Sequence, residues 1–370
     1  MQQGVSLAPQ VEERRGVAKG FAIFGSVFAA GFRTHLIPYI LALSILVSGF
    51  AAVEFGGGSA ITPSFQAFAT KYLAMAATYV LLFLLIIKFL RMVFVERPEK
   101  PLMHLAQWGF SNLTDGRRLA NGIHGSLFTF MMMSGFTMWK NQVAVLGHFA
   151  SDQNLASLDL LLHGGLLPQD GLALIFGFPV AAKIIDLAYL LWFPMLFGST
   201  FIMSFQPRQT FLRLRFMIAM ALAWVLGGIV TANIFSSAGP VYYGRLNPAP
   251  DLYAGHMELI RSLSASARLE ALVLQDSLWA AYATTPSFSS ISAFPSMHVA
   301  IAMLVFLACR HISWWLKYLS AAYLGFIFLG SIFLGWHYAI DGYAGAGIAL
   351  AAWWLGGVIA KKYGTEQASS

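Results

Sequence analysis

Charged residues are scarce in this chain. Only 11% of its 370 residues are Asp, Glu, Lys or Arg, whereas about a quarter of a soluble domain is charged. Hydrophobic residues make up 58% of the chain. Several stretches of about twenty residues carry few or no charges, which is long enough to cross a hydrocarbon core roughly 30 Å thick. The composition therefore excludes a soluble globular domain and indicates a polytopic helical membrane protein.

Cysteine is nearly absent as well. The single Cys309 lies in an apolar segment, so the chain can build neither a disulfide framework nor a thiolate metal cage. The net charge of +7 comes from short patches of cations and not from a basic run interleaved with aromatic residues, which argues against nucleic acid as a partner. The polar residues 1–17 lack the apolar core of a signal peptide, so we expect the N-terminus to be retained.

Apolar segments predict an all-α polytopic membrane protein with about eight transmembrane helices. The predicted spans cover residues 36–55, 72–94, 121–139, 183–205, 216–236, 296–311, 318–336 and 338–360. Residues 18–33 are too short, and too strongly flanked by cations, to form a span. We expect them to form an amphipathic helix that lies in the membrane interface or packs against the core.

The cations are distributed unevenly between the two sides of this topology. If the N-terminus is cytoplasmic, seventeen of the 23 Lys and Arg residues fall on the cytoplasmic side. Cytoplasmic loops of membrane proteins are enriched in Lys and Arg, so we expect both termini in the cytoplasm. The outer side holds the remaining cations, which are Lys71, Lys140, Lys183, Arg245, Arg261 and Arg268.

Two stretches at predicted helix ends on the outer side carry candidate catalytic groups. They read FPSMHVA at residues 294–300 and GSIFLGWHYAIDGYAGAG at residues 330–347. His337 and Asp341 are four residues apart, so at a helix start they share one face and the carboxylate can orient the imidazole. The other ring nitrogen is then free as a nucleophile, and His298 from another helix can protonate a leaving oxygen.

Ser296 is a candidate for phosphate binding. It falls in the first turn of its predicted helix, where free backbone N–H groups and the helix dipole favour an anion. A catalytic role for its hydroxyl is disfavoured, because no local base or oxyanion hole accompanies it. A metal site made from two histidines and one aspartate is also disfavoured, since no further cluster lies near them.

Other polar residues have two possible roles each. His124 and His311 are expected to pack or hydrogen-bond within the protein, as most lone histidines in membrane proteins do. Asp186 lies within a predicted span, where an acid is either functional or hydrogen-bonded to a neighbouring helix. Lys140 and Lys183 either bind lipid phosphates at the outer leaflet or cap their helices.

The two stretches resemble the type 2 phosphatidic acid phosphatase superfamily. Its second signature reads PSGH and its third ends in HxxxD, and here residues 295–298 read PSMH and residues 337–341 read HYAID. The resemblance implies that His337 is the nucleophile and forms a phosphohistidine, that Asp341 orients it, and that His298 is the acid. It also implies a six-helix core, formed here by the third to eighth spans.

The sequence departs from this family where the phosphate-binding cations belong. Gly330 and Ser331 stand where the third signature has Ser-Arg, and SSAGPVYYGRLNP at 236–248 stands in the region of the first signature. A site with fewer cations stabilises a doubly charged phosphate monoester less well than a phosphodiester or a diphosphate that other groups partly hold. The pattern is similar to the inositol phosphorylceramide synthase-like branch, in which a phosphohead group passes to a lipid hydroxyl. Beside Ser296, the candidate substrate-binding residues are Arg245, Tyr242, Tyr243 and Tyr338.

We expect one membrane domain organised around this core. The predicted regions are a cytoplasmic N-terminus with an interfacial helix at 1–35, two accessory transmembrane helices and a cytoplasmic loop at 36–120, the six-helix catalytic core at 121–362 with outer loops at 140–182 and 237–295, and a disordered tail at 363–370. Apolar residues at helical spacing beside charges predict an amphipathic helix or helix pair in the second outer loop.

The predicted function is a membrane-embedded phosphotransferase that uses a phosphohistidine on the extracytoplasmic side. Its partners are the membrane and a lipid phosphate or phospholipid substrate, and the mechanism requires neither metal nor other cofactor. The first alternative is a phosphatase that releases phosphate from a lipid phosphate or polyprenyl diphosphate to water. The second is a transporter or binding protein, which the complete His-His-Asp set disfavours. The sequence leaves the oligomeric state and the lipid head group open.

Overall fold

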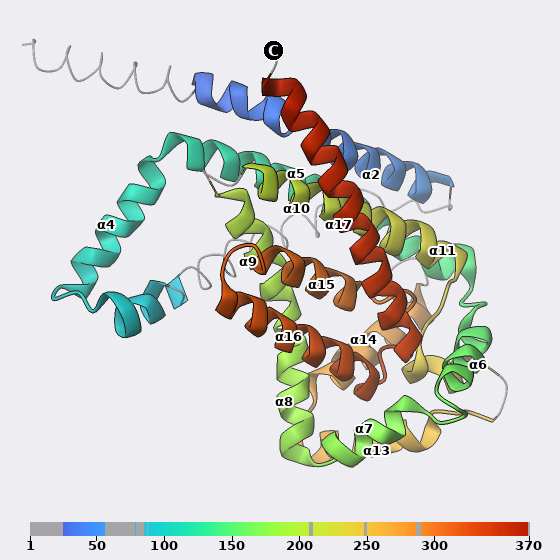
Figure 1. The fold of residues 1–370 in the computed structure, drawn as a ribbon. Helices are drawn as coiled ribbons and strands as arrows, with labels where there is room; N and C mark the ends of the chain where they lie inside the picture. Colours follow the sequence, from blue (N-terminus) through green and yellow to red (C-terminus); the bar gives the residue numbers. More distant parts are fainter. Residues whose placement is uncertain are drawn as a thin grey trace, which may run out of the picture.

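The computed structural model describes residues 25–55, 78, 85, 86, 88–206, 210–247, 250–285 and 290–368 (Figure 1). Within these residues the chain folds into helices joined by short connections, and it forms no strand. The prediction of an all-α protein is therefore confirmed.

The N-terminal helices pack against the longest helix of the structure. Residues 25–34 are helical and lead into α2 (Leu36–Phe55), which packs along α5 (Gly116–Gly147). The ring of Phe28 stacks on His124 of α5 with 4.3 Å between centroids, and the Tyr39 hydroxyl lies 2.8 Å from His124 Nδ1. His124 is thus a packing and hydrogen-bonding residue, as expected. The described part of the predicted interfacial helix packs against the core.

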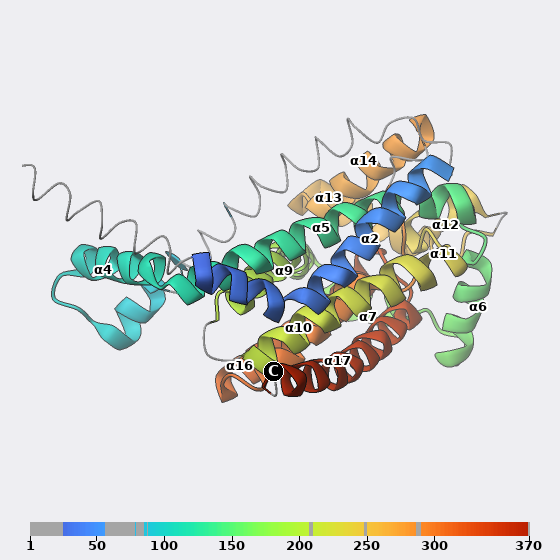
Figure 2. The ribbon, with the colours of Figure 1, turned by 90° about the horizontal axis from the view of Figure 1, so that it is seen from above.

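Part of the segment between α2 and α5 is described. It contains the π-helical turn η1 (Met92–Glu96) and α4 (Pro101–Thr114), and α4 extends away from the bundle (Figures 1 and 2). Asp115 then starts α5, because its carboxylate accepts hydrogen bonds from the N–H groups of Arg117 and Arg118, both at 3.1 Å. Most of the predicted span 72–94 lies outside the described residues.

One membrane span is interrupted near its middle. It consists of α8 (Pro179–Leu190) and α9 (Trp192–Ser204), with the break at Leu191. Pro194 explains the break, since it lacks the N–H that would bond to the carbonyl of Leu190 and its ring crowds that carbonyl. Residues 179–204 together are long and apolar enough to cross a membrane.

The core of the protein surrounds α10 (Thr210–Ala223). This helix continues through the π-helical segment η2 (Trp224–Thr231) into α11 (Ala232–Ile234). The side chains of residues 216–221 are completely buried. Helix α10 contacts α2 and also α15 (Met297–Cys309) and α17 (Ala339–Ala368). Helix α16 (Trp314–Phe333) packs on α15, which completes the bundle.

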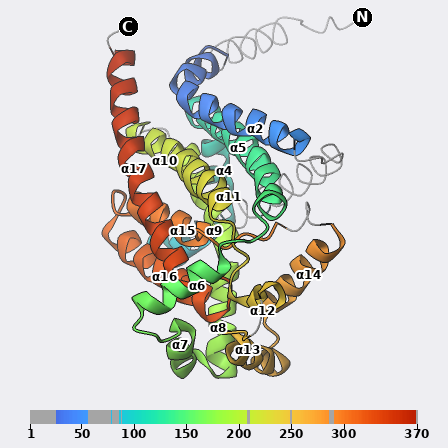
Figure 3. The ribbon, with the colours of Figure 1, turned by 90° about the vertical axis from the view of Figure 1, so that its right-hand side faces the viewer.

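Short helices gather at one end of this bundle. They are α6 (Asp152–Leu162), α7 (Pro168–Phe176), η3 (Pro240–Tyr242), α12 (Tyr243–Leu246), α13 (Ala254–Ala267) and α14 (Glu270–Thr284). Figure 3 shows α6, α7 and α13 at the end opposite to the last turns of α17. The helix pair predicted in the second outer loop is present as α13 and α14.

Five described segments are long and apolar enough to span a membrane, and they are 36–55, 179–204, 210–234, 314–333 and 339–363. Each corresponds to one of the eight predicted spans. Helix α15 is apolar but has only 13 residues, and the predicted span 121–139 lies within α5, which is not among the five. Leu43 and Val47 of α2 and Trp354 of α17 are exposed large apolar side chains, as expected where lipid is the solvent. The protein is therefore an integral membrane protein.

The C-terminal tail differs from its prediction. We expected residues 363–370 to be disordered, but α17 continues to Ala368. A helix that already exists is extended at little cost, and Glu366, Gln367 and Ala368 are good helix formers. Composition alone misjudged this segment because it ignored the helix that precedes it.

Candidate active site

His337 and Asp341 form the pair that their spacing predicts. His337 lies in the connection between α16 and α17, and Asp341 lies in the first turn of α17. Nδ1 of His337 is 3.1 Å from Oδ2 of Asp341, and the same oxygen accepts the N–H of Tyr338 at 3.1 Å. Both side chains are buried. The carboxylate therefore fixes the imidazole and leaves Nε2 as the nitrogen available for chemistry.

His298 approaches this pair from the first turn of α15. The centroids of the His298 and His337 rings are 6.0 Å apart. Two contacts hold the starts of the helices together. The N–H of Ser296 donates to the carbonyl of Asp341 at 2.9 Å, and an added Cβ at Gly345 would lie 2.3 Å from the carbonyl oxygen of Ser296. The structure thus brings together all three candidate catalytic residues.

Ser296 is the N-cap of α15. Its hydroxyl accepts a hydrogen bond from the N–H of Val299 at 3.4 Å, and the side chain is fully buried. This contact starts the helix in the orientation that directs His298 toward His337. Binding of phosphate by Ser296 stays a prediction.

Two aromatic residues from the α8–α9 segment enclose His298. Its ring stacks on Tyr189 at 4.7 Å and packs on Trp192 at 4.2 Å between centroids. The indole N–H of Trp192 also donates to the backbone carbonyl of His298 at 3.1 Å. Sequence reasoning did not single out these residues, because aromatic side chains are frequent in every span of this chain.

Helix α6 contributes two buried carboxylates that the sequence analysis also missed. Asp152 accepts hydrogen bonds from the Ser237 hydroxyl at 2.6 Å and from the Tyr338 hydroxyl at 2.9 Å. The N–H groups of residues 238 and 239 donate to it at 2.9 and 3.0 Å. Asp159 accepts the N–H of Ile340, at the start of α17, at 3.0 Å. The seven-residue spacing of the two acids, two turns on one helix face, was the available signal.

Lys140 brings a positive charge to the histidines. It lies near the C-terminal end of α5, directly after the predicted span 121–139. Burial lowers the pKa of Lys140 to about 8. Burial and the charge of Lys140 together lower the pKa of His337 to about 3, against a smaller opposing effect of a hydrogen bond with the backbone of Ala293. His337 is therefore a neutral imidazole at physiological pH.

The position of Lys140 also follows from its neighbours in the chain. The side-chain oxygen of Asn141 accepts a hydrogen bond from Ser290 at 2.6 Å, and the carbonyl of Val143 accepts one from Ser236 at 3.0 Å. This end of α5 is thus attached to the segments that precede α15 and follow α11. In the described part of the chain, Lys140 forms no ion pair with a carboxylate.

The predicted binding tyrosines are engaged within the protein. The hydroxyl of Tyr242 donates to the carbonyl of Gln275 at 2.8 Å, and its ring stacks on Trp279 at 5.4 Å. Tyr243 is buried against Tyr253 at 5.3 Å, and the Tyr338 hydroxyl is bonded to Asp152. These contacts give the tyrosines packing roles, and direct contact with a substrate stays a prediction.

Asp186 caps α14, which belongs to the segment 237–295. Its two oxygens accept the N–H groups of Glu270 and Ala271, both at 2.9 Å, at the start of α14. Nζ of Lys183 lies 3.3 Å from the same carboxylate. Of the two roles weighed for Asp186, the structure supports hydrogen bonding to a neighbouring helix.

Metal binding has no support from the described side chains. Among them, no group of three or more His, Cys, Asp or Glu residues is placed to hold a metal ion.

Comparison with known families agrees with the geometry. The sequence model of the PAP2 superfamily matches residues 154–355, a range that includes His298, His337 and Asp341. No curated protein and no solved structure matches the chain. The matched range is more than half of the 370 residues. By this match, which contains the three residues that the fold brings together, the chain belongs to the PAP2 superfamily.

Proposed function

We propose that this protein is a phosphotransferase that moves a phosphoryl or phosphohead group from a lipid donor to a hydroxyl acceptor through a phosphohistidine. Membership of the PAP2 superfamily indicates phosphatase or phosphotransferase activity on lipid phosphates in a membrane. The observation that carries the mechanism is the contact of 3.1 Å between His337 and Asp341, with the ring of His298 at 6.0 Å.

The first step transfers the group to the enzyme. Nε2 of neutral His337 attacks the phosphorus, and the bond from phosphorus to the leaving oxygen breaks. His298 takes up a proton when the anionic group of the substrate binds beside it, and it donates that proton to the leaving oxygen. Asp341 stabilises the positive charge that develops on the imidazole of His337. Burial of the pair strengthens this interaction, since water screens it poorly there.

The second step returns the enzyme to its starting state. His298, now without its proton, accepts the proton of the acceptor hydroxyl. The hydroxyl oxygen attacks phosphorus, and the bond from phosphorus to Nε2 of His337 breaks. The proton that His298 gives up in the first step is regained in the second, so the two steps together need no other proton donor or acceptor.

Lys140 provides a positive charge to a site that has few other cations. The third signature of this chain has Gly330 and Ser331 where related phosphatases carry Ser-Arg. The half-buried Lys140 acts on His337 electrostatically, and a single cation there can stabilise one equatorial oxygen of the transferring group. One such charge suits a phosphodiester, which carries a single negative charge, better than a doubly charged monoester. This supports transfer, and with it the resemblance to the inositol phosphorylceramide synthase-like branch, over simple dephosphorylation.

The orientation of the site is part of this proposal. The catalytic residues lie at the starts of α15 and α17, and α17 begins at the end of the bundle where α6, α7 and α13 gather (Figure 3). The excess of Lys and Arg in loops of the opposite side supports an extracytoplasmic site and cytoplasmic termini. Eight spans, including α5, α15 and the segment at 72–94, fit this arrangement.

A transfer assay distinguishes the two reactions. The purified protein in lipid nanodiscs is given a phospholipid donor with an isotopically labelled phosphate, with and without a lipid that carries a free hydroxyl. We expect the label in a new phospholipid and faster donor consumption when the acceptor is present. Release of the label to water at the same rate with and without acceptor would show hydrolysis instead, as inorganic phosphate from a monoester donor or as a phosphate monoester from a diester donor.

A further inference from the structure

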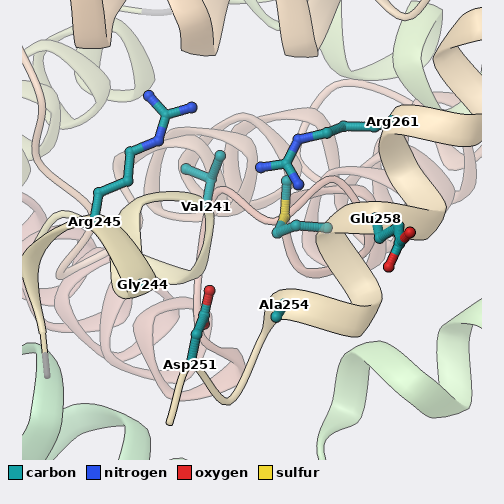
Figure 4. Close-up of a pocket in the computed structure, with 8 residues that line it drawn as sticks. Val241, Gly244, Arg245, Asp251, Ala254, Glu258 and Arg261 are labelled. Carbon is teal, nitrogen blue, oxygen red and sulfur yellow. The ribbon is translucent and has the colours of Figure 1, made fainter. Parts of the chain in front are cut away.

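A pocket of about 510 Å³ lies between α12 and α13. Four of its lining side chains are charged, two of each sign, and they are Arg245, Arg261, Asp251 and Glu258. Figure 4 shows the side chains of Arg245 and Arg261 directed toward each other from opposite sides of the pocket, with the carboxylate of Asp251 below them. The volume is in the range of sites that bind small molecules.

The opposite charges of this pocket do not neutralise each other. Among the ion pairs of the described residues, none joins either arginine to Asp251 or Glu258. Arg245 instead makes a contact of 3.5 Å with Asp276 outside the pocket and lies over the ring of Trp279 at 4.9 Å. Among the described residues, Asp251, Glu258 and Arg261 thus have no ion-pair partner, and the carboxylate that Arg245 contacts lies outside the pocket.

Asp251 is held in place by the backbone around it. Its Oδ1 accepts the N–H of Tyr253 at 2.9 Å, and its Oδ2 lies 2.1 Å from the position that a Cβ on Gly244 would occupy. Only glycine at 244 allows this approach. The carboxylate therefore sits against the residue that precedes Arg245, and its position is set before any ligand binds.

The wall of the pocket touches the loop that carries the proposed nucleophile. The N–H of Val241 donates to the carbonyl of Gly335 at 3.0 Å, and an added Cβ at Gly335 would lie 2.6 Å from Sδ of Met257. Gly335 is two residues before His337. A group bound in this pocket would thus lie beside the backbone of the catalytic loop.

We infer that this pocket binds a zwitterionic aminoalkyl phosphate group beside the catalytic loop, with its phosphate between the two arginines and its ammonium group at Asp251. The inference rests on the proposed phosphotransfer and adds a second phosphate-binding position, distinct from the phosphorus that His337 attacks. Guanidinium groups match phosphate geometry, and complementary charges of both signs reject a ligand that carries only one sign. The ligand is either the head group of a membrane lipid or a free aminoalkyl phosphate.

Binding is measured on the whole chain in nanodiscs made of neutral glycolipid, with His337→Ala so that turnover does not interfere. The probes are phosphoethanolamine, which is zwitterionic, glycerol 3-phosphate, which is anionic, and ethanolamine, which is cationic. We expect phosphoethanolamine to bind most tightly. Arg245→Ala and Arg261→Ala should each weaken it about tenfold, as expected for the loss of one charge-assisted contact. Asp251→Asn should remove the preference over glycerol 3-phosphate.

Arg268→Ala is the matched control, since Arg268 is exposed on the same outer helices but does not line the pocket. Arg261→Glu gives a second test, because an exposed position tolerates charge reversal and binding should be lost. Equal affinity for the zwitterion and the anion, or equal binding by the wild type, Arg261→Ala and Arg261→Glu, would overturn the inference. Competition by phosphatidylethanolamine in the nanodisc assigns the pocket to a lipid, and no competition assigns it to a free aminoalkyl phosphate. The binding measurement does not depend on turnover. Failure to detect a phosphohistidine would therefore contradict the proposed function but not the binding of a ligand in this pocket.

Discussion

The hydroxyl of Tyr338 donates a hydrogen bond to Asp152 at 2.9 Å, although 186 residues separate the two in the sequence. The same carboxylate holds residues 237–239, and Tyr338 is adjacent to His337. Asp152 therefore joins the segment after α11 to the catalytic loop. The loop at 140–182, whose role the sequence left open, supports the candidate active site through α6.

Asp152→Asn should destabilise the protein and slow turnover. The amide that replaces one carboxylate oxygen faces N–H and O–H donors, so at least one buried donor loses its acceptor, at a cost of about 1–3 kcal/mol in unfolding free energy. Tyr338→Phe loses only one hydrogen bond, and we expect about 1 kcal/mol. Thermal unfolding in detergent and turnover of each variant check this. Asp170→Asn is the control, because Asp170 is exposed on α7. A melting temperature of Asp152→Asn equal to that of this control would contradict the role of Asp152.

Gly345→Ala should reduce turnover strongly. Its new Cβ would lie 2.3 Å from the carbonyl oxygen of Ser296, so α17 must move away from α15 and His337 from His298. A displacement of about 1 Å at reacting groups can lower the rate about a hundredfold. Gly347→Ala is the matched control two residues further along α17, where an added Cβ meets no atom within 4 Å. The comparison uses turnover at equal amounts of folded protein. Equal turnover of the two variants would show that the close approach of these helices does not position the histidines.

The sequence predicted the candidate catalytic residues but not the residues around them. His298, His337 and Asp341 could be found because their chemistry depends on local spacing and on a shared membrane side. Tyr189, Trp192 and Asp152 act through contacts between distant segments, and no short pattern encodes such contacts. Lys140 was noticed as an outer-side cation, but only the packing of the end of α5 places its charge near His337.

The helices, too, could be predicted only where the properties of one segment determine them. Apolar runs predicted the helices at 36–55, 314–333 and 339–363, because the length and composition of a span are properties of one segment. The break between α8 and α9 follows from Pro194 but was not predicted, since a long apolar stretch conceals it. The extension of α17 to Ala368 depends on the preceding helix and not on the composition of the tail.

Lys140 should control the alkaline side of the pH profile. Burial lowers its pKa to about 8, so the lysine carries its charge below that pH and loses it above. We expect kcat/KM of the wild type to fall above about pH 8, and the fall to move to higher pH in Lys140→Arg, because arginine keeps its charge. Lys140→Met should lower kcat about 100–1000-fold at all pH values, as the loss of one stabilising group in other active sites does.

The control for Lys140 is Lys183→Met. Lys183 contacts Asp186 and the carbonyl of Arg268 on the outer helices, so its loss should leave the pH profile of kcat/KM unchanged. An alkaline limb that stays in place in Lys140→Arg would assign the titration to another group.

Isolation of the phosphorylated enzyme tests the proposed chemistry most directly. The protein is mixed with a labelled lipid donor, quenched at alkaline pH within the first turnover and digested, and the peptide that contains residues 330–347 is analysed by mass spectrometry. We predict an acid-labile phosphoryl or phosphohead group on His337, absent from His337→Ala and still formed, more slowly, in Asp341→Asn. Turnover by folded His337→Ala at the wild-type rate, or a modification on another residue such as Ser296, would contradict the assignment of His337 as the nucleophile.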